Sequence, residues 1–237
     1  MNKTKLLEHY IYFLSTHRGK LESLDGVDLI HSGKPYFNIA LPSSKMNIES
    51  IGSEFKIYIP EWLNFDGNII NNREKSGSLT FMTLPNVQVE WEINQNLVVR
   101  KSTSDTDLED FSFVQGKGFC ETEEEYNEWH PWMQNKNLKN YRNSEQRFYI
   151  GYKDSRPMGV CLSIVHDGIM GIYAVATLPE FRKQGISTTI MRQAIKDYLN
   201  EDTSLDKSVI LQVMTNSYAH QFYKKLGFAD VFACAIY

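Results

Sequence analysis

A basic loop lies between an apolar run and an amphipathic segment in the stretch "TLPEFRKQGISTTI", from Thr177 to Ile190. The start of a helix carries unpaired backbone N–H groups and a partial positive charge, so a polar turn that leads into it can hold an anion. Arg182 and Lys183 add formal charge, and Gly185 lets the backbone approach a ligand closely. Taken alone, the stretch fits an ordinary turn better than a cradle for phosphate.

Strands and helices predicted from the same half of the chain position this loop. Apolar, β-branched runs from residue 147 to 177 are separated by the turns "KDSRP" and "HDG", which predicts three antiparallel strands. Apolar residues at helical spacing predict a helix from residue 186 to 198. "SVILQVM", from Ser208 to Met214, predicts a central strand, and "NSYAHQFYKKLGF" predicts a helix that stops at Gly227.

A strand and a helix are predicted before these three strands, and a further strand after the last helix. "LVVRKS" has the composition of a strand, and "TSDTDLEDFSFVQGKGF" predicts a helix capped by Ser104, with Asp107 near the positive end of its dipole. The final "VFACAIY" can close the sheet. This order of elements predicts an α+β fold.

The first ninety-odd residues have a different texture. An amphipathic segment from Leu6 to Leu14 predicts a helix, and short strand-like runs such as "YFNIAL", "FKIYI" and "LTFMTL" follow it, separated by Gly, Pro and Asn. The change near residue 95 predicts a smaller N-terminal α/β domain at 1–95 and a second domain at 96–237.

The composition argues against several classes of protein. A hydrophobic fraction of 42% is typical of a folded chain, and a net charge of −4 gives no sign of a nucleic-acid or membrane-surface partner. The apolar runs are too short to cross a bilayer, and we expect no signal peptide. Scattered cysteines without CxxC spacing, and histidines without HxH or HxxxH spacing, predict reduced thiols, a cytoplasmic location and no metal site.

Two motifs together resemble a known family. "VATLPEFRKQGIS" is similar to the acyl-CoA-binding signature of the GNAT superfamily of N-acyltransferases, Arg-x-x-Gly-x-Gly/Ala after a strand and Pro-Glu. "LQVMTNSYAHQFYKKLGF" resembles the segment that follows it in the family, with an Asn near the helix start and a Tyr before a Gly-Phe stop. The resemblance covers residues 97–237. It implies a mixed, mostly antiparallel sheet flanked by helices and splayed between the strand before "LPEFR" and "VILQV", where coenzyme A would enter.

The resemblance also implies a role for each matching position. The strand whose open edge should pair with the pantetheine arm ends with Val175, Ala176 and Thr177. The pyrophosphate should bind to the loop and first helical turn formed by Arg182, Lys183, Gln184, Gly185, Ile186, Ser187 and Thr188. Asn216 should contact the pantetheine arm, and Tyr223 should protonate the leaving thiolate. Ser187 departs from the pattern, since Gly or Ala is usual there, but it is small and its hydroxyl is able to donate to a phosphate.

The implied reaction moves an acetyl group from acetyl-CoA to a primary amine by direct attack. The amine must be neutral, as roughly one lysine-like group in 10³ is at pH 7, so a base or water chain is needed, and the residues identify none. A backbone N–H near Val175 is the expected oxyanion donor. A phenol, whose ordinary pKa is about 10, can protonate the thiolate. By spacing alone, Tyr223 fits an aromatic side chain packed beside Phe222 better than a catalytic acid, and it is the motif around it that favours the catalytic role.

Other parts of the chain leave alternatives open. Glutamates crowd the segment where this family usually builds its acceptor site, namely Glu121, Glu123, Glu124, Glu125 and Glu128. They fit a solvated helix face better than an attractor of cationic amines, and Tyr126, Trp129 and Trp132 fit either a pocket lining or a cover for the core. Residues 1–95 loosely resemble a degenerate, non-catalytic GNAT-like half, with a packing or acceptor-shaping role.

Readings other than an N-acetyltransferase are also open. The main alternative is a catalytically inactive acyl-CoA-binding sensor or structural pseudo-enzyme. A homodimer is compatible with either function. A generic nucleotide-phosphate binder is disfavoured, because the sequence has neither GxxxxGK[ST] nor GxGxxG.

Overall fold

The C-terminal strand of the chain lies in a sheet built mainly by N-terminal residues. In the computed structural model, β13 (Ala229–Ile236) pairs with β4 (Lys56–Pro60) on one edge and with β7 (Gly77–Leu84) on the other. The described residues are 2–44, 48, 51–65, 69–70, 72–87, 90–201 and 207–237. The chain divides into two compact units, unit 1 with Met1–Leu84 and Leu211–Tyr237 and unit 2 with Pro85–Ile210.

Unit 2 contains an antiparallel sheet and its helices. The strand order is β11-β10-β9-β8, and each neighbouring pair is antiparallel. The elements in chain order are β8 (Val98–Lys101), α2 (Asp105–Phe119), α3 (Glu123–Asn140), β9 (Gln146–Lys153), β10 (Arg156–His166), β11 (Ile169–Thr177), a 3₁₀ turn (Pro179–Phe181) and α4 (Ile186–Asn200). The three strands predicted within residues 147–177, the strand and helix before them and the helix after them are therefore confirmed.

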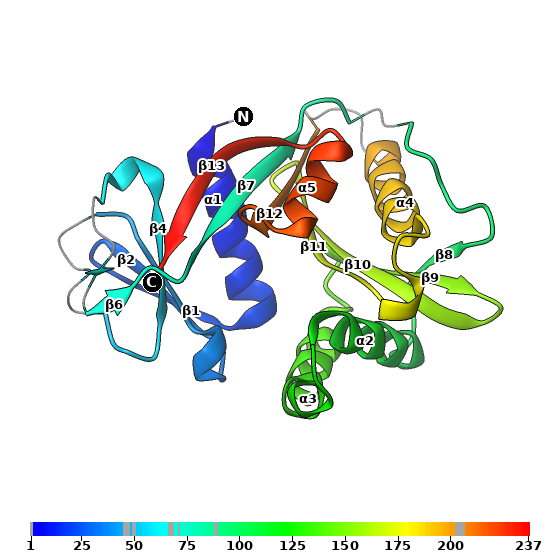
Figure 1. Cartoon of the computed structure of the whole chain (residues 1–237), viewed down its shortest axis with the longest axis horizontal. Coiled ribbons are helices and arrows are strands. Elements are labelled where there is room, and N and C mark those ends of the chain that lie inside the picture. The colour runs from blue at the N-terminus through cyan, green and yellow to red at the C-terminus, as the bar shows by residue number, and fades with distance from the viewer. Residues whose placement is uncertain are drawn as a thin grey trace. The chain divides into compact units, whose positions relative to one another are not determined.

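Helices cover both faces of this sheet. A Cβ added at Gly159 of β10 would meet Ile186 of α4, whereas Ala176 of β11, which pairs with the next residue of β10, faces Gly118 of α2. Successive side chains of a strand point to opposite faces, so α4 and α2 lie on opposite sides of the sheet, as Figure 1 shows. A strand that is buried on both faces needs a continuous apolar run, which explains why "GVCLSIV" in β10 does not alternate.

Helix α2 begins with the predicted cap. Oγ of Ser104 accepts a hydrogen bond from the backbone N–H of Asp107 at 3.1 Å, and Oδ2 of Asp107 accepts one from the N–H of Ser104 at 3.0 Å. Partial burial raises the pKa of Asp107, but the hydrogen bonds from Thr103 and Ser104 outweigh it and leave the pKa below its ordinary value. The carboxylate therefore stays charged near the positive end of the helix dipole.

Unit 1 contains a mixed sheet with the strand order β1-β2-β3-β4-β13-β7, in which β3 and β4 are parallel and the other pairs antiparallel. Its further elements are α1 (Lys3–Phe13), a π-helical turn (Leu14–Arg18), β1 (Lys20–Leu24), β2 (Val27–His31), a 3₁₀ turn (Pro35–Phe37), β3 (Ile39–Pro42), a 3₁₀ turn (Glu61–Leu63), β5 (Ile69–Ile70), β6 (Arg73–Glu74) and α5 (Tyr218–Lys225). Strand β12 (Ser208–Met214) passes from unit 2 into unit 1 after Ile210.

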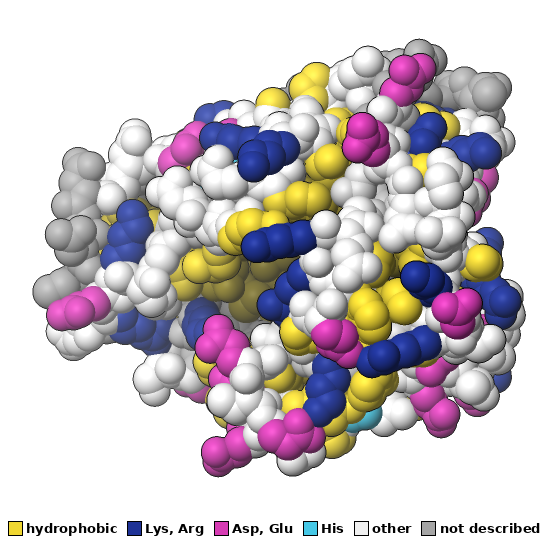
Figure 2. Space-filling view, turned by 45° about the vertical axis from the view of Figure 1, so that its right-hand side comes forward, with side chains coloured by type: hydrophobic (Ala, Val, Ile, Leu, Met, Phe, Trp, Pro, Cys, Tyr) yellow, Lys and Arg dark blue, Asp and Glu magenta, His cyan; other side chains and the backbone are white. Residues whose placement is uncertain are grey.

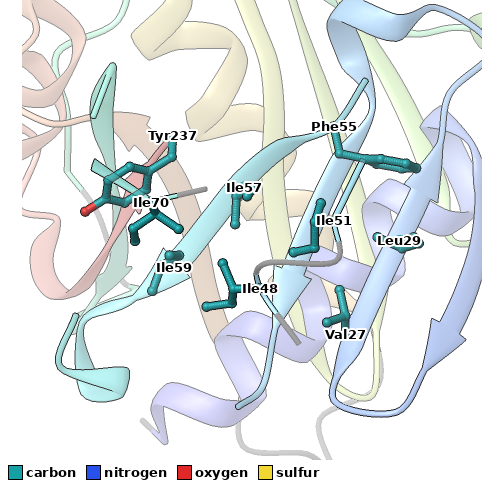
Figure 3. Close-up of a cluster of buried hydrophobic side chains, with 10 residues drawn as sticks. Val27, Leu29, Ile48, Ile51, Phe55, Ile57, Ile59, Ile70 and Tyr237 are labelled. Atoms are coloured by element: carbon teal, nitrogen blue, oxygen red, sulfur yellow. The ribbon is translucent and has the colours of Figure 1, made fainter. Parts of the chain in front are cut away.

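A cluster of buried hydrophobic side chains forms a core of unit 1 and is drawn in Figure 3. Its members are Val27, Leu29, Ala40, Ile48, Ile51, Phe55, Ile57, Ile59, Ile70 and Tyr237. The guanidinium of Arg73 donates to the backbone carbonyls of Phe55 and Ile51, which ties the segment between them to β6. Tyr237 and Ile57 exchange backbone hydrogen bonds of 3.0 and 2.9 Å, so the last residue of the chain helps to close this core.

The predicted fold class, α+β with a mixed, mostly antiparallel sheet flanked by helices, is confirmed. The domain boundary near residue 95 stays a prediction, as do the cytoplasmic location and the homodimer. No helix in the described part of the chain is long and apolar enough to span a membrane. On the face that Figure 2 shows, basic and acidic side chains are interspersed, in keeping with the small net charge.

Candidate active site

The end of β11 carries a β-bulge. The pairing with β10 changes register so that two residues of β11, Ala174 and Val175, face the single residue Cys161. Ala174 has a φ of +48°, in the left-handed region. A bulge leaves its extra residue out of the ladder, so a backbone N–H in this segment is not used by β10. The expected oxyanion donor near Val175 belongs to this bulge.

The loop between β11 and α4 has an unusual backbone. Lys183 has a φ of +63° and Gly185 a φ of +72°, and Gln184 between them is outside the left-handed region. Gly185 leads directly into the right-handed first turn of α4, and backbone that passes between left- and right-handed conformations turns neighbouring N–H groups into one concavity, which suits an anion. Among the described residues, a Cβ added at Gly185 would meet only the backbone nitrogen of Asn94, at 3.9 Å. The protein therefore leaves space beside Gly185.

Helix α4 starts without a side-chain cap. The other described α-helices each have an N-cap side chain that accepts from the first turn, namely Asn2, Ser104, Thr122 and Ser217. The N-cap of α4 is Gly185, and its first turn has no acidic residue. The N–H of Thr189 donates to the carbonyl of Gly185 at 2.9 Å. The amides of Ile186, Ser187 and Thr188 precede this bond and are donors that a bound anion can use.

Side chains tie the loop to β11 and α2. Oγ of Ser187 lies 2.7 Å from Oγ1 of Thr177, so the residue that departs from the family pattern bonds to the end of the strand. The guanidinium of Arg182 donates to the carbonyl of Gly118 at 3.0 Å and to that of Thr177 at 3.4 Å. Arg182 therefore stabilises the loop through hydrogen bonds and also adds positive charge to it. Lys183 is exposed.

Asn94 contacts the loop from a distant part of the chain, and no local pattern marks it. Its Nδ2 donates to the carbonyl of Gln184 at 3.0 Å, and its backbone N–H donates to Oγ1 of Thr189 at 2.8 Å. In a trans peptide the carbonyl and the following N–H point in opposite directions. Because the Gln184 carbonyl points to Asn94, the N–H of Gly185 points away from it. Asn94 thus orients one amide of the loop.

Helix α5 in unit 1 carries the other two predicted site residues. Asn216 precedes the N-cap Ser217 and has a φ of +61° and an exposed side chain. Tyr223 is only 8% exposed, and its ring lies beside those of Phe222 and Phe228, with centroid distances of 5.2 and 5.8 Å. The packing role that spacing alone suggested for Tyr223 is thus present, whatever else its hydroxyl does.

A buried histidine on α5 bonds to one of these residues. Nδ1 of His220 accepts from the backbone N–H of Asn216 at 3.1 Å, and Nε2 lies 2.8 Å from Oδ1 of Asp230 in β13. Nζ of Lys224 lies 2.8 Å from Oδ2 of the same carboxylate. Partial burial raises the pKa of Asp230, but the hydrogen bonds from Lys224 and His220 outweigh it and leave the pKa below its ordinary value. The sequence grouped His220 with ordinary histidines and missed this arrangement.

The segment from α2 to α5 matches a protein-family model. The model, described as the acetyltransferase (GNAT) family, aligns with residues 107–228, just over half of the chain. The chain belongs to the GNAT acetyltransferase family. It is therefore an acyltransferase of the N-acetyltransferase type. No curated protein matches the sequence. Because the model begins at residue 107, the degenerate GNAT-like nature of residues 1–95 stays a prediction.

Solved structures resemble this GNAT chain over nearly its whole length. A GCN5-related N-acetyltransferase from Kribbella flavida has a TM-score of 0.68 and 10% identity, covering 98% of this chain and 93% of its own. A functionally unknown conserved protein from Staphylococcus epidermidis has a TM-score of 0.67 and 14% identity, with 93% of each chain covered. A putative GNAT acetyltransferase from Novosphingobium aromaticivorans has a TM-score of 0.58 and 14% identity, covering 91% and 89%. At such identities the likeness concerns the fold.

The predicted GNAT site residues fall into two groups. Those of the strand end, loop and first helical turn lie together in unit 2, namely Val175, Ala176, Thr177, Arg182, Lys183, Gln184, Gly185, Ile186, Ser187 and Thr188. Asn216 and Tyr223 lie in unit 1. The structure brings the first group together around one helix N-terminus, and the part that the second group plays there stays a prediction.

The acidic segment of this GNAT domain forms the first turns of α3, except that Glu121 lies just before the N-cap Thr122. Its glutamates are exposed, except for the half-buried Glu125. A Cβ on Gly116 of α2 would lie 2.7 Å from the ring of Tyr126, and that ring stacks on His130 with a centroid distance of 4.7 Å. Tyr126 therefore packs α3 against α2, and the glutamates occupy a solvated helix face, as the sequence favours.

Proposed function

We propose that this GNAT enzyme transfers an acetyl group from acetyl-CoA to a primary amine. The observation that carries the proposal is the loop at the start of α4, where left-handed residues Lys183 and Gly185 lead into a helix without a side-chain cap. A diphosphate presents several anionic oxygens, which suit the amides from Gly185 to Thr188 and the exposed ammonium of Lys183. An ordinary turn needs none of these features together.

The end of β11 supports the same proposal. The pantetheine arm of coenzyme A contains amide groups, which can bond to backbone groups in the way that an added strand does. Val175, Ala176 and Thr177 lead directly into the loop, and Ser187 of the first helical turn bonds to Thr177. The strand end and the diphosphate loop are therefore linked, so that one extended ligand can bind along both.

The proposed reaction needs one attack and three proton transfers. The amine nitrogen, after losing a proton to a base or a water chain, forms a bond to the acetyl carbon, and the carbonyl oxygen becomes an oxyanion. A backbone N–H of the bulge at Val175 donates to that oxyanion. The carbon–sulfur bond then breaks, the sulfur takes a proton from the phenol of Tyr223, and the nitrogen loses a second proton to water to become the neutral amide. The products are an acetylated amine and free coenzyme A.

The proposal is tested by thiol release from acetyl-CoA with a panel of primary amines, and with the N,N-dimethyl form of each amine as its matched control. We expect release with at least one primary amine and none with its dimethyl form, because a tertiary amine cannot yield a stable amide. Binding of coenzyme A without amine-dependent release would favour the acyl-CoA sensor. Failure to bind coenzyme A would refute both functions.

Asn94→Ala should weaken the binding of coenzyme A about 5-fold, since of the two side-chain hydrogen bonds that it removes, the one to the Gln184 carbonyl orients the loop and is worth about 1 kcal/mol. Calorimetric titration measures the affinity. Asn96→Ala is the matched control, because Asn96 belongs to the same segment and its hydrogen bond to Asn94 comes from the backbone N–H, which alanine keeps. Equal losses in the two variants would show that Asn94 does not orient the loop.

A further inference from the structure

A reciprocal pair of hydrogen bonds fixes the turn in front of α5. The backbone N–H of Asn216 donates to Nδ1 of His220 at 3.1 Å, and the backbone N–H of His220 donates to Oγ of Ser217 at 3.1 Å. This is a variant of the capping box, in which the third helical residue turns its side chain back toward the start of the helix. Here that residue is a histidine, and its target is the residue before the cap.

The hydrogen bonds of His220 select one tautomer of its imidazole ring. Nδ1 accepts a hydrogen bond only while it carries no proton, so the proton of the neutral ring lies on Nε2 and is donated to Asp230 at 2.8 Å. Lys224 holds the second oxygen of that carboxylate. His220 is 2% exposed, so water has little access to either bond. Lys224 and Asp230 together hold the ring of His220 in one orientation.

The backbone of Asn216 is held in place by its hydrogen bond to His220. Its φ of +61° is one that L-residues other than Asn and Asp seldom adopt. Its side chain is exposed, and the side-chain amide has no hydrogen bond to another described residue. The turn thus presents two donors and one acceptor of a side-chain amide to a ligand. Without the acceptor at Nδ1, the N–H of Asn216 loses its partner and the turn is free to change its φ.

We propose that His220 is a positioning residue for coenzyme A, which acts by holding the turn that presents the Asn216 amide to the pantetheine arm. The proposal rests on the proposed function, in which Asn216 contacts that arm. It assigns no role in proton transfer to His220, since both ring nitrogens are already engaged in unit 1.

Two substitutions of His220 distinguish the roles of its two ring nitrogens, because each keeps the hydrogen bond of only one of them. The side-chain oxygen of asparagine reaches the place of Nδ1, so His220→Asn keeps an acceptor for Asn216. The amide of glutamine reaches the place of Nε2, so His220→Gln keeps only the partner of Asp230. Calorimetry with coenzyme A should show affinity about 10-fold weaker in His220→Gln and rescue to within about 3-fold of the wild type in His220→Asn. The KM for the amine should change in neither variant.

A double-mutant cycle tests whether His220 acts through Asn216. Asn216→Gly keeps a residue that favours positive φ and removes the amide, so it should lose the same factor of about 10. Adding His220→Gln to it should cost no further affinity. Additive losses, equal losses in the Asn and Gln variants of His220, or wild-type affinity in His220→Gln would each overturn the proposal.

Two further outcomes are interpretable. If His220→Gln does not fold, His220→Asn and Asn216→Gly still decide, because each must give the affinity stated for it. A wild-type protein that binds no coenzyme A would refute the proposed function itself, which is a different result from wild-type binding without dependence on His220.

Discussion

Tyr223→Phe should lower kcat about 100-fold and change the KM for acetyl-CoA by less than about 2-fold. The thiolate of coenzyme A needs a proton as it leaves, and the phenylalanine variant has none to give. The ring itself packs beside Phe222 and Phe228, and phenylalanine keeps that packing. Thiol release at saturating amine, followed across a range of acetyl-CoA concentrations, gives both constants.

Tyr218→Phe is the matched control for this substitution. Tyr218 lies on the same helix but is 75% exposed, so the loss of its hydroxyl should leave kcat within about 2-fold of the wild type. Wild-type turnover in Tyr223→Phe would remove Tyr223 from the mechanism. A raised KM with unchanged kcat would assign the hydroxyl to ground-state binding instead.

The strands that position the loop were predictable because their signals are local. The turn of the β9–β10 hairpin contains Asp154 and Ser155, with φ values of +50° and +62°, and that of the β10–β11 hairpin contains Asp167 and Gly168, with values of +48° and +72°. Positive φ at both central residues is typical of tight hairpin turns, and Asp and Gly are residues that supply it. Composition alone therefore located these turns.

The part of the fold that was missed depends on long-range pairing or on weak patterns. Strand β1 is exposed along its length, so it lacks the alternation that marks a half-buried strand, and only its Asp25-Gly26 turn indicates a hairpin. Strand β13 was expected to close a sheet, but its partners β4 and β7 lie far away in the chain. A hydrophobic pattern predicts a strand and does not name its neighbours.

The same distinction divides the site. The loop from Arg182 to Thr188 was predicted from its resemblance to the family signature, which is contiguous, because amides at a helix start need only a local sequence. Asn94 and the pair of His220 with Asp230 act through contacts between separate elements, and a lone histidine or asparagine in a sequence has no feature that indicates such a contact. The bulge at Val175 likewise could not be predicted from the sequence, since it is defined by the register of β11 with β10.

Ser187→Leu should abolish measurable coenzyme A binding, a loss of at least about 100-fold, or near 2.7 kcal/mol. Ser187 is half-buried, and its Oγ lies 2.7 Å from Oγ1 of Thr177. Leucine cannot replace that bond, and its branched side chain would fill the space between the end of β11 and the first turn of α4. Titration with coenzyme A measures the loss, and a thermal unfolding midpoint close to that of the wild type shows that the protein still folds.

The partner experiment is Ser187→Ala, which introduces a residue that is usual at this position of the family signature. If size at position 187 governs access to the first-turn amides, alanine should bind coenzyme A within about 3-fold of the wild type, because it loses only the bond to Thr177. If alanine loses as much as leucine, the hydroxyl pair and not the space is what the loop requires. Wild-type affinity in the leucine variant would show that the diphosphate does not bind at the start of α4.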